Sequence, residues 1–362
     1  MTLRFEAECR PLLIGSLPLG DHSAANRLVF KYTPDIPLWV QLPVYAREGM
    51  IPQFTPGLPG VRIVDGRTFV DTAATDYEQQ MLEFYEEYMA VMEGQLDLNR
   101  SRFILNADTA PGFAVLMENL PEQPSPIAVK GQVTGPFTFC TGLKDDNRQA
   151  IFYNLQVRDA AVKLLSMKAA WQVRQMSDTG RSVIIFCDEP ALAGFGTSEF
   201  LSVSRVDITT CLEEIMAAVH TAGGLVGIHI CANTDWSLAL ESPADIINFD
   251  AYTYFDRFIL YPELIRKFIE SGKILAWGIV PTGDEDDLTR ETAESLTTQW
   301  YEKVRALEDL GISRRQIAAQ SLITPSCGAG TLSPALAERV LQLTREVSDR
   351  LRRAFGFEST LN

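Results

Sequence analysis

The sequence has few residues of the kinds that bind metals or form disulfides, with 3 histidines and 6 cysteines among 362 residues. The cysteines are scattered along the chain, so no compact disulfide framework and no zinc-finger spacing is present. Cysteines spaced in this way are typical of reduced thiols and not of disulfide bonds. Their positions are Cys9, Cys140, Cys187, Cys211, Cys231 and Cys327.

Basic residues are also scarce, because 47 Asp and Glu outnumber 32 Lys and Arg and give a formal net charge of -15. A chain this acidic repels phosphate backbones, so we expect no nucleic-acid partner. No apolar run approaches the ~18 residues that a membrane span needs. The opening "MTLRFEAECR" lacks the apolar core of a secretory signal. We therefore expect a cytoplasmic protein with no membrane partner.

Short apolar runs rich in Val and Ile are frequent, and helical patterns separate most of them. Runs without polar alternation are typical of strands buried on both faces of a parallel sheet. Eight such strands alternating with helices predict an α/β fold, a (β/α)8 TIM barrel built from residues 1–362 as a single domain. The runs are 11–16, 37–42, 126–132, 182–189, 224–231, 245–250, 274–280 and 317–325.

A long insertion is expected after the second strand, at about residues 45–125. It opens with the Pro- and Gly-rich "REGMIPQFTPGLPGV". Within it, Asp65-Gly66 predicts a hairpin turn, and a helix is expected over 76–93. Helical patterns are also expected over 147–178 and 206–222 and near the C-terminus, where Ser333 is the predicted cap of the last helix.

Reactive residues follow the predicted strands at their carboxyl ends, which is where this fold carries its catalytic groups. We therefore expect them to meet at one mouth of the barrel. They are Gly15 and Ser16 after strand one, Asp188 and Glu189 after strand four, His229 and Cys231 after strand five, Asp250 after strand six, and Cys327 after strand eight.

His229, Cys231, Asp250 and Cys327 form a candidate metal site. Side-chain alternation along a strand puts His229 and Cys231 on the same face. Imidazole, two thiolates and a carboxylate are ligands that suit Zn²⁺. Taken alone, a His-x-Cys at a strand end also fits simple core packing, and a lone cysteine often does. Their common position at the mouth favours the metal.

Six segments carry a resemblance to a known family: "LLIGSLP", "VTGPFTF", "IIFCDEPAL", "GIHICAN", "INFDAY" and "TPSCGAGTL". With them the sequence resembles the cobalamin-independent methionine synthases. More broadly, it resembles the barrel superfamily of uroporphyrinogen decarboxylases and corrinoid-linked methyltransferases. A His-x-Cys followed by a distant Cys in this strand order is fairly specific for the zinc thiol-methyltransferase branch.

The resemblance implies a catalytic zinc held by His229, Cys231 and Cys327. Its fourth protein ligand would be an acid on the next strand, which falls on Asp250 where the family usually has Glu.

The same resemblance implies binding of a small amino-acid thiol. Its carboxylate would contact Ile14, Gly15 and Ser16, and its ammonium would pair with Asp188, which is also a catalytic candidate. Glu189, the next residue, is a further substrate-binding candidate.

Two departures from the family bear on the methyl donor. Methionine synthases of this kind have a further amino-terminal half that helps to bind folate, whereas this sequence accounts for one barrel. They also carry a His that assists protonation of the folate, and the matching segment here reads "WGIVPTGDEDD". His22, after strand one, is the remaining catalytic candidate, and His220 is expected to be structural.

A methylated corrinoid tolerates the loss of that His, because cob(I)alamin leaves as a stable base. We therefore hypothesise methyl transfer from a methylcorrinoid protein to homocysteine or to a thiol such as coenzyme M. Three alternatives stay open: a decarboxylase of the uroporphyrinogen type, a non-catalytic barrel that binds a corrinoid or thiol, and a zinc hydrolase.

Overall fold

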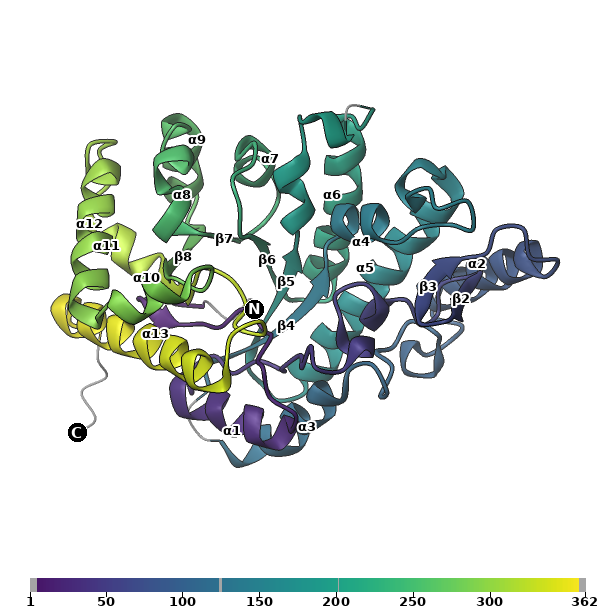
Figure 1. Cartoon of the computed structure of the whole chain (residues 1–362), viewed down its shortest axis with the longest axis horizontal. Coiled ribbons are helices and arrows are strands. Elements are labelled where there is room, and N and C mark those ends of the chain that lie inside the picture. Colours follow the sequence, from purple (N-terminus) through teal and green to yellow (C-terminus); the bar gives the residue numbers. More distant parts are fainter. Residues whose placement is uncertain (1–4, 124–125, 201, 358–362) are drawn as a thin grey trace.

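The computed structural model describes residues 5–123, 126–200 and 202–357. Its centre is a curled parallel sheet of seven strands in the order β1-β9-β8-β7-β6-β5-β4 (Figure 1). The strands are β1 (Arg10–Pro11), β4 (Ala128–Thr134), β5 (Ser182–Asp188), β6 (Leu225–Ile230), β7 (Ile246–Phe249), β8 (Ile274–Val280) and β9 (Ser321–Pro325).

Helices follow most of these strands and cover the outer face of the sheet (Figure 1). One helix begins at Pro262, and the Ser333 side chain accepts a hydrogen bond from the Leu336 amide at the start of the last helix, as predicted. The helices are α1 (His22–Tyr32), α2 (Tyr77–Met92), α3 (Pro111–Asn119), α4 (Pro136–Gly142), α5 (Leu155–Ser177), α6 (Arg205–Thr221), α7 (Ser237–Leu240), α8 (Ala251–Phe258), α9 (Pro262–Glu270), α10 (Glu285–Arg290), α11 (Ala293–Glu308), α12 (Arg314–Ala319) and α13 (Pro334–Phe355).

The expected second strand, 37–42, is not a strand, and the described chain has seven strands in this sheet instead of eight. The segment makes isolated parallel bridges, Ser16 with Gln41 and Leu38 with Lys130, so it touches β4 on one side and the continuation of β1 on the other. Prolines at positions 37 and 43 lack the N–H groups that a longer ladder needs. The first strand is likewise shorter than the predicted 11–16, and the helix expected from residue 147 begins at Leu155.

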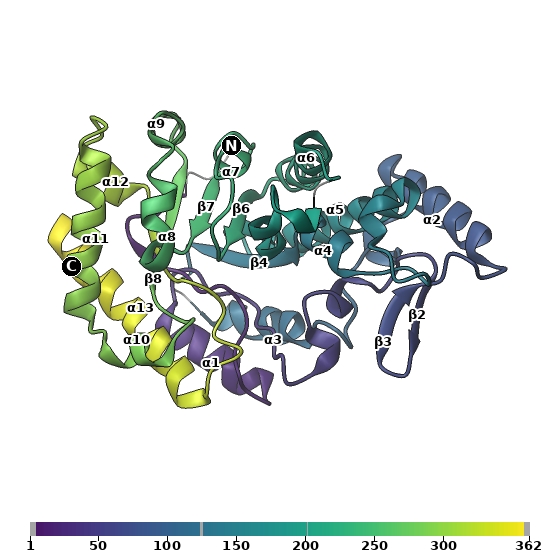
Figure 2. The same cartoon turned by 45° about the horizontal axis from the view of Figure 1, so that its top comes forward.

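Residues between this segment and β4 form the predicted hairpin and helix. β2 (Val61–Val64) and β3 (Arg67–Val70) pair antiparallel. Asp65 and Gly66 at their turn both have positive φ, 50° and 75°, as a two-residue hairpin turn requires. Figure 2 shows this hairpin and α2 at one end of the molecule, away from the sheet. Residues 124–125, at the end of the expected insertion, lie outside the described residues.

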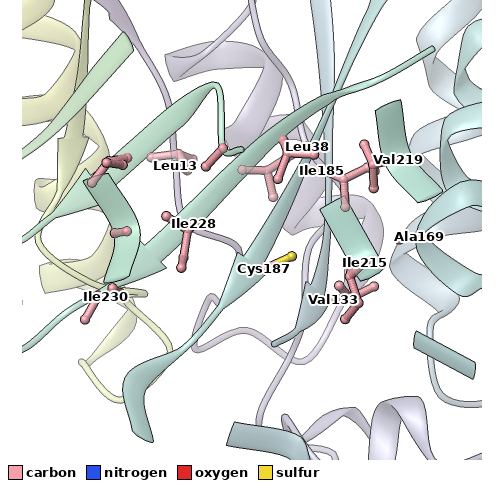
Figure 3. Packing of buried hydrophobic residues seen from close by; sticks show 14 of the residues in the cluster. Leu13, Leu38, Val133, Ala169, Ile185, Cys187, Ile215, Val219, Ile228 and Ile230 are labelled. Carbon is pink, nitrogen blue, oxygen red and sulfur yellow. The ribbon is translucent and has the colours of Figure 1, made fainter. Parts of the chain in front are cut away.

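Alternate residues of each strand face opposite sides of the sheet. Ile185, Cys187 and Ile228 belong to the large apolar cluster that includes Ile215 and Val219 of α6 (Figure 3). The inward positions form a separate apolar cluster that includes Ala128, Ile184, Phe186, Ile246 and Leu322. Toward the carboxyl ends of the strands, these inward positions become buried and polar: Lys130, Gln132, Asp188, His229 and Asn248.

Membrane-spanning helices were also sought. Within the described ranges, every helix is too short or too polar to cross a bilayer.

Candidate metal centre

Three of the predicted ligands converge at the carboxyl end of the sheet. His229 lies in β6, Cys231 follows β6, and Cys327 follows β9. One ligand atom from each lies within 4.8 Å of the others. His229 is buried, and the two cysteines are partly exposed. Two residues about a hundred positions apart are therefore brought to one point by the parallel order of the strands.

The ring of His229 is held in one orientation by Asn248 of β7, which pairs with His229 in the strand register. The Asn248 Nδ2 donates to the Ala276 carbonyl at 2.9 Å and to the Thr324 hydroxyl at 2.7 Å. Its Oδ1 must therefore be the atom that faces His229 Nδ1 and accepts a hydrogen bond from it. This keeps a proton on Nδ1, so Nε2 is the ring nitrogen that His229 would offer to a metal.

The two thiols shift each other's pKa in opposite directions. Hydrogen bonds from Cys231 and His229 hold the pKa of Cys327 well below its usual range, although burial opposes this. The same contact, together with burial, raises the pKa of Cys231. Burial alone would lower the pKa of His229, but its hydrogen bond to Cys327 and the charge there raise it overall. These shifts favour the thiolate form at Cys327 over that at Cys231.

The loop that carries Cys327 is pinned by close contacts with Ser16. The Ala329 amide donates to the Ser16 carbonyl at 3.1 Å, and the Gly330 amide donates to the Ser16 hydroxyl at 3.3 Å. A Cβ on Gly328 would collide with that hydroxyl. The glycines of "SCGAG" are thus needed for the loop to approach Ser16 closely enough to place Cys327 beside His229.

A pocket of about 390 Å³ opens above the cluster. His229, Cys231 and Cys327 line it, together with Ile14 and Ser16. Gly15 lies between the last two, where a Cβ would stand 2.9 Å from Gln41 Oε1. The residues predicted to bind the substrate carboxylate, which follow strand one, therefore lie beside the predicted metal ligands.

Asp188 places a carboxylate in this pocket. It is 8% exposed, and its Oδ1 has no hydrogen-bond partner within the described chain. Burial raises the pKa of Asp188, while the charges of Lys130 and His229 act in the opposite direction. Lys130 is fully buried below, where its Nζ donates to the Ile14 carbonyl, and burial lowers its pKa to about 8. Among the described lining residues, none is Lys or Arg.

Two predicted site residues have other partners. Asp250 caps α8, where its carboxylate accepts a hydrogen bond from the Thr253 amide at 2.8 Å, and it is not part of the three-residue cluster. Glu189 accepts hydrogen bonds from the Phe137 and Thr138 amides at 2.9 and 2.8 Å, which satisfies the start of α4. Burial raises the pKa of Glu189 to about 7. Neither carboxylate is among the described residues that line the pocket.

Glu48 is a site residue that the sequence did not reveal. It follows the irregular segment after residue 42 and lines the pocket, while its side chain is inaccessible to water. The Leu42 amide donates to its carboxylate at 2.9 Å. His22 lies behind it, with Nε2 at 3.0 and 3.1 Å from the two carboxylate oxygens. The carboxylate of Glu48 is thus fully engaged by His22 and the Leu42 amide.

Comparisons with known proteins leave the family open. Models of known protein families gave no match, and curated protein sequences gave none either. Among solved structures, the chain is similar to a B12-independent methionine synthase from Shewanella sp. W3-18-1 in complex with selenomethionine, with 19% identity over 67% of this chain and 68% of that chain and a TM-score of 0.46. It is also similar to a beta-glycosidase from the hyperthermophile Thermosphaera aggregans, with 11% identity over 92% and 87% of the two chains and a TM-score of 0.31.

Proposed function

We propose that this protein is a zinc-dependent methyltransferase that transfers a methyl group to a small amino-acid thiol such as homocysteine. The observation that carries the proposal is the cluster of His229, Cys231 and Cys327 at the floor of a pocket. A buried imidazole held through Nδ1 by Asn248, with two thiols beside it, has little use as core packing. They are what a thiol-activating metal site requires.

The residues present fit zinc. The ligand atoms of a tetrahedral zinc with nitrogen and sulfur donors lie about 3.5–4 Å apart, and the three atoms here lie within 4.8 Å of one another. Three protein ligands leave one position for a substrate atom, as catalytic zinc sites do. Asp250 stays a candidate for a further ligand, in which case its cap on α8 would be broken. When bound, zinc would supply the positive charge that keeps a substrate thiol ionised at neutral pH.

The charges of the pocket favour an acceptor with an ammonium group. Asp188 presents a buried oxygen without a partner within the described chain. A sulfonate thiol such as coenzyme M would meet this carboxylate without the Lys or Arg that would attract it. Asp188 would hold the ammonium, and the segment after β1, at Ile14 and Ser16, would receive the carboxylate. These contacts would orient the sulfur toward the cluster.

The donor we propose is a methylcorrinoid carried by a partner protein. Folate as a donor would need a group that protonates its leaving nitrogen, and His229 is the sole histidine among the described lining residues. That histidine is committed to the cluster. A corrinoid donor needs no such acid, so the pocket would have to exclude water and align sulfur with the methyl group.

Metal analysis of the purified protein tests the core of the proposal. We expect about one zinc per chain, lost in Cys231→Ser and in Cys327→Ser, as a single site with three protein ligands requires. Cys211→Ser, in α6 and away from the cluster, is the matched control and should keep its zinc. The zinc-loaded protein should then demethylate methylcobalamin with homocysteine but not with coenzyme M.

Two other outcomes of that experiment point elsewhere. Tight zinc with no demethylation by any thiol would favour the non-catalytic binding protein. No zinc in the wild type, after reconstitution under reducing conditions, would remove the methyltransferase proposal. Neither result would support a decarboxylase for polycarboxylates, because the described pocket lining has the Asp188 carboxylate and no Lys or Arg.

A further inference from the structure

One wall of the pocket contains a glutamine, Gln41, whose side chain is only partly used by the protein. Gln41 is paired with Ser16 by an isolated parallel bridge. Its backbone amide donates to the Gly15 carbonyl at 3.1 Å, and its backbone carbonyl accepts from the Leu17 amide at 3.0 Å. Gln41 is therefore held beside the segment that would receive the substrate carboxylate.

The orientation of the Gln41 side-chain amide follows from two residues behind it. Gln53 is fully buried, and its Nε2 donates to the Thr109 carbonyl at 2.7 Å. A backbone carbonyl can only accept, so Oε1 of Gln53 is the atom that faces Gln41, and Nε2 of Gln41 must donate to it. The Thr109 hydroxyl also donates to the Gln53 carbonyl at 2.9 Å, which ties these two residues together a second time. The end of the Gln41 amide that remains for the pocket is therefore its oxygen.

This oxygen is unused by the described chain. Oε1 of Gln41 accepts no hydrogen bond from a described residue, and it is not one of the enclosed polar atoms of that part of the chain, so it is open to the pocket. A Cβ on Gly15 would stand 2.9 Å from it, which places the oxygen against the segment after β1. Oδ1 of Asp188 is a second oxygen without a partner in the described part of the pocket. The pocket thus presents two hydrogen-bond acceptors, one charged and one neutral.

We propose that Gln53 orients the Gln41 amide so that its oxygen, together with Asp188, selects thiols that carry a primary ammonium group. This inference rests on the proposed function and names the residues that decide which thiols bind. An ammonium group has three N–H donors and no acceptor, so it matches a pair of acceptor oxygens. In an α-amino acid the ammonium and the carboxylate are attached to the same carbon. An acceptor beside Gly15 is therefore next to the carboxylate site, as such a substrate requires.

The opposite orientation of the Gln41 amide would favour another class of ligand. With Nε2 toward the pocket, Gln41 would donate hydrogen bonds and would suit a carboxylate or a sulfonate. Gln53 prevents this orientation, because a reversed Gln41 would place its own oxygen against Oε1 of Gln53, and two acceptors cannot share a hydrogen bond. Gln53 is not among the described residues that line the pocket, so it is a positioning residue and not a contact of the substrate.

Calorimetric titration of the zinc-loaded protein with two thiols tests the proposal. Homocysteine carries the ammonium group, and γ-mercaptobutyrate is the same molecule without it. Gln41→Met keeps the length of the side chain but removes the acceptor. Homocysteine should therefore bind to this variant about 10- to 100-fold more weakly, as the loss of a hydrogen bond to a charged group predicts. The affinity for γ-mercaptobutyrate should stay as it is in the wild type.

Two variants of Gln53 separate the orientation of the amide from a general effect on folding. Gln53→Glu keeps an oxygen toward Nε2 of Gln41, whether or not the new carboxyl is protonated, so it should bind homocysteine as the wild type does. Gln53→Leu removes that oxygen and lets the Gln41 amide turn over. It should therefore bind homocysteine more weakly than Gln53→Glu and bind γ-mercaptobutyrate equally well. About one zinc per chain in all three variants would show that the cluster is intact.

The results distinguish this proposal from the function on which it rests. Unchanged homocysteine affinity in Gln41→Met, or equal losses for both thiols, would overturn the ammonium site and leave the methyltransferase proposal standing. Equal homocysteine affinities of Gln53→Glu and Gln53→Leu would overturn the role of Gln53. A wild type that holds zinc and binds neither thiol would overturn the proposed function itself.

Discussion

Asn248→Ala should weaken zinc binding without touching a metal ligand. Asn248 is fully buried and makes three side-chain hydrogen bonds, to His229, to the Ala276 carbonyl and to the Thr324 hydroxyl. The last two decide which way its amide points, and this in turn decides which nitrogen of His229 carries the proton. Removing the amide frees the ring to rotate or to change tautomer, so Nε2 would no longer be presented to the metal.

The size of the effect follows from the contacts. Groups that hold a metal-binding histidine through its second nitrogen contribute about 10–100-fold to metal affinity. That range corresponds to about 1.4–2.8 kcal/mol of binding free energy. The apo protein should also lose about 1–3 kcal/mol of unfolding free energy, because the buried Nδ1–H of His229 is left without an acceptor.

Competition with a chromophoric chelator measures the zinc affinity of each variant directly. Thr324→Val is the graded control, since it removes one of the two groups that orient the amide and leaves the contact with His229 intact. We expect wild type to bind most tightly, then Thr324→Val, then Asn248→Ala, with His229→Ala weakest. The reasoning is refuted if Asn248→Ala binds zinc as wild type does while His229→Ala does not.

Three further changes test other parts of the structure. Gly328→Ala should cost about 1–3 kcal/mol of stability and weaken zinc binding, since its Cβ meets the Ser16 hydroxyl, and chelator competition should show recovery in Gly328→Ala combined with Ser16→Gly. Burial lowers the pKa of Lys168 from 10.5 to about 7, so between these values the unfolded chain holds a proton that the folded chain has lost. Wild-type stability in urea should therefore rise with pH across this window, and Lys168→Met should reduce that rise and leave the part that Lys130 contributes, since burial lowers the pKa of Lys130 to about 8. Asp188→Asn should weaken homocysteine binding by about tenfold or more, as loss of a buried charge partner requires, and leave a thiol without an ammonium unaffected in the same calorimetric titration.

The sequence was most informative where a residue pattern maps directly onto geometry. Strand period two places His229 and Cys231 on one face, and parallel strand order brings Cys327 to the same end of the sheet. Positive φ at Asp65 and Gly66 is likewise a local requirement of the predicted turn. These predictions needed no knowledge of side-chain packing.

Predictions that depended on competition between partners were less complete. The apolar run 37–42 has the composition of a strand, yet its flanking prolines and its position between two edges leave it with isolated bridges. Asp250 ends a strand as the ligand pattern requires, but an aspartate there also caps the next helix, and the sequence cannot rank the two roles. Glu189 shows the same ambiguity, because its carboxylate satisfies two amides of α4.

Residues missed by the sequence reasoning are those whose role exists only through a neighbour. Asn248 is a polar residue inside the apolar run "DIINFD", two positions before Asp250. Residues two apart in a strand share a face, so the sequence could have placed Asn248 on the same face as the candidate ligand Asp250. Glu48 gives no such signal, since it lies in an irregular segment and meets His22 26 residues away.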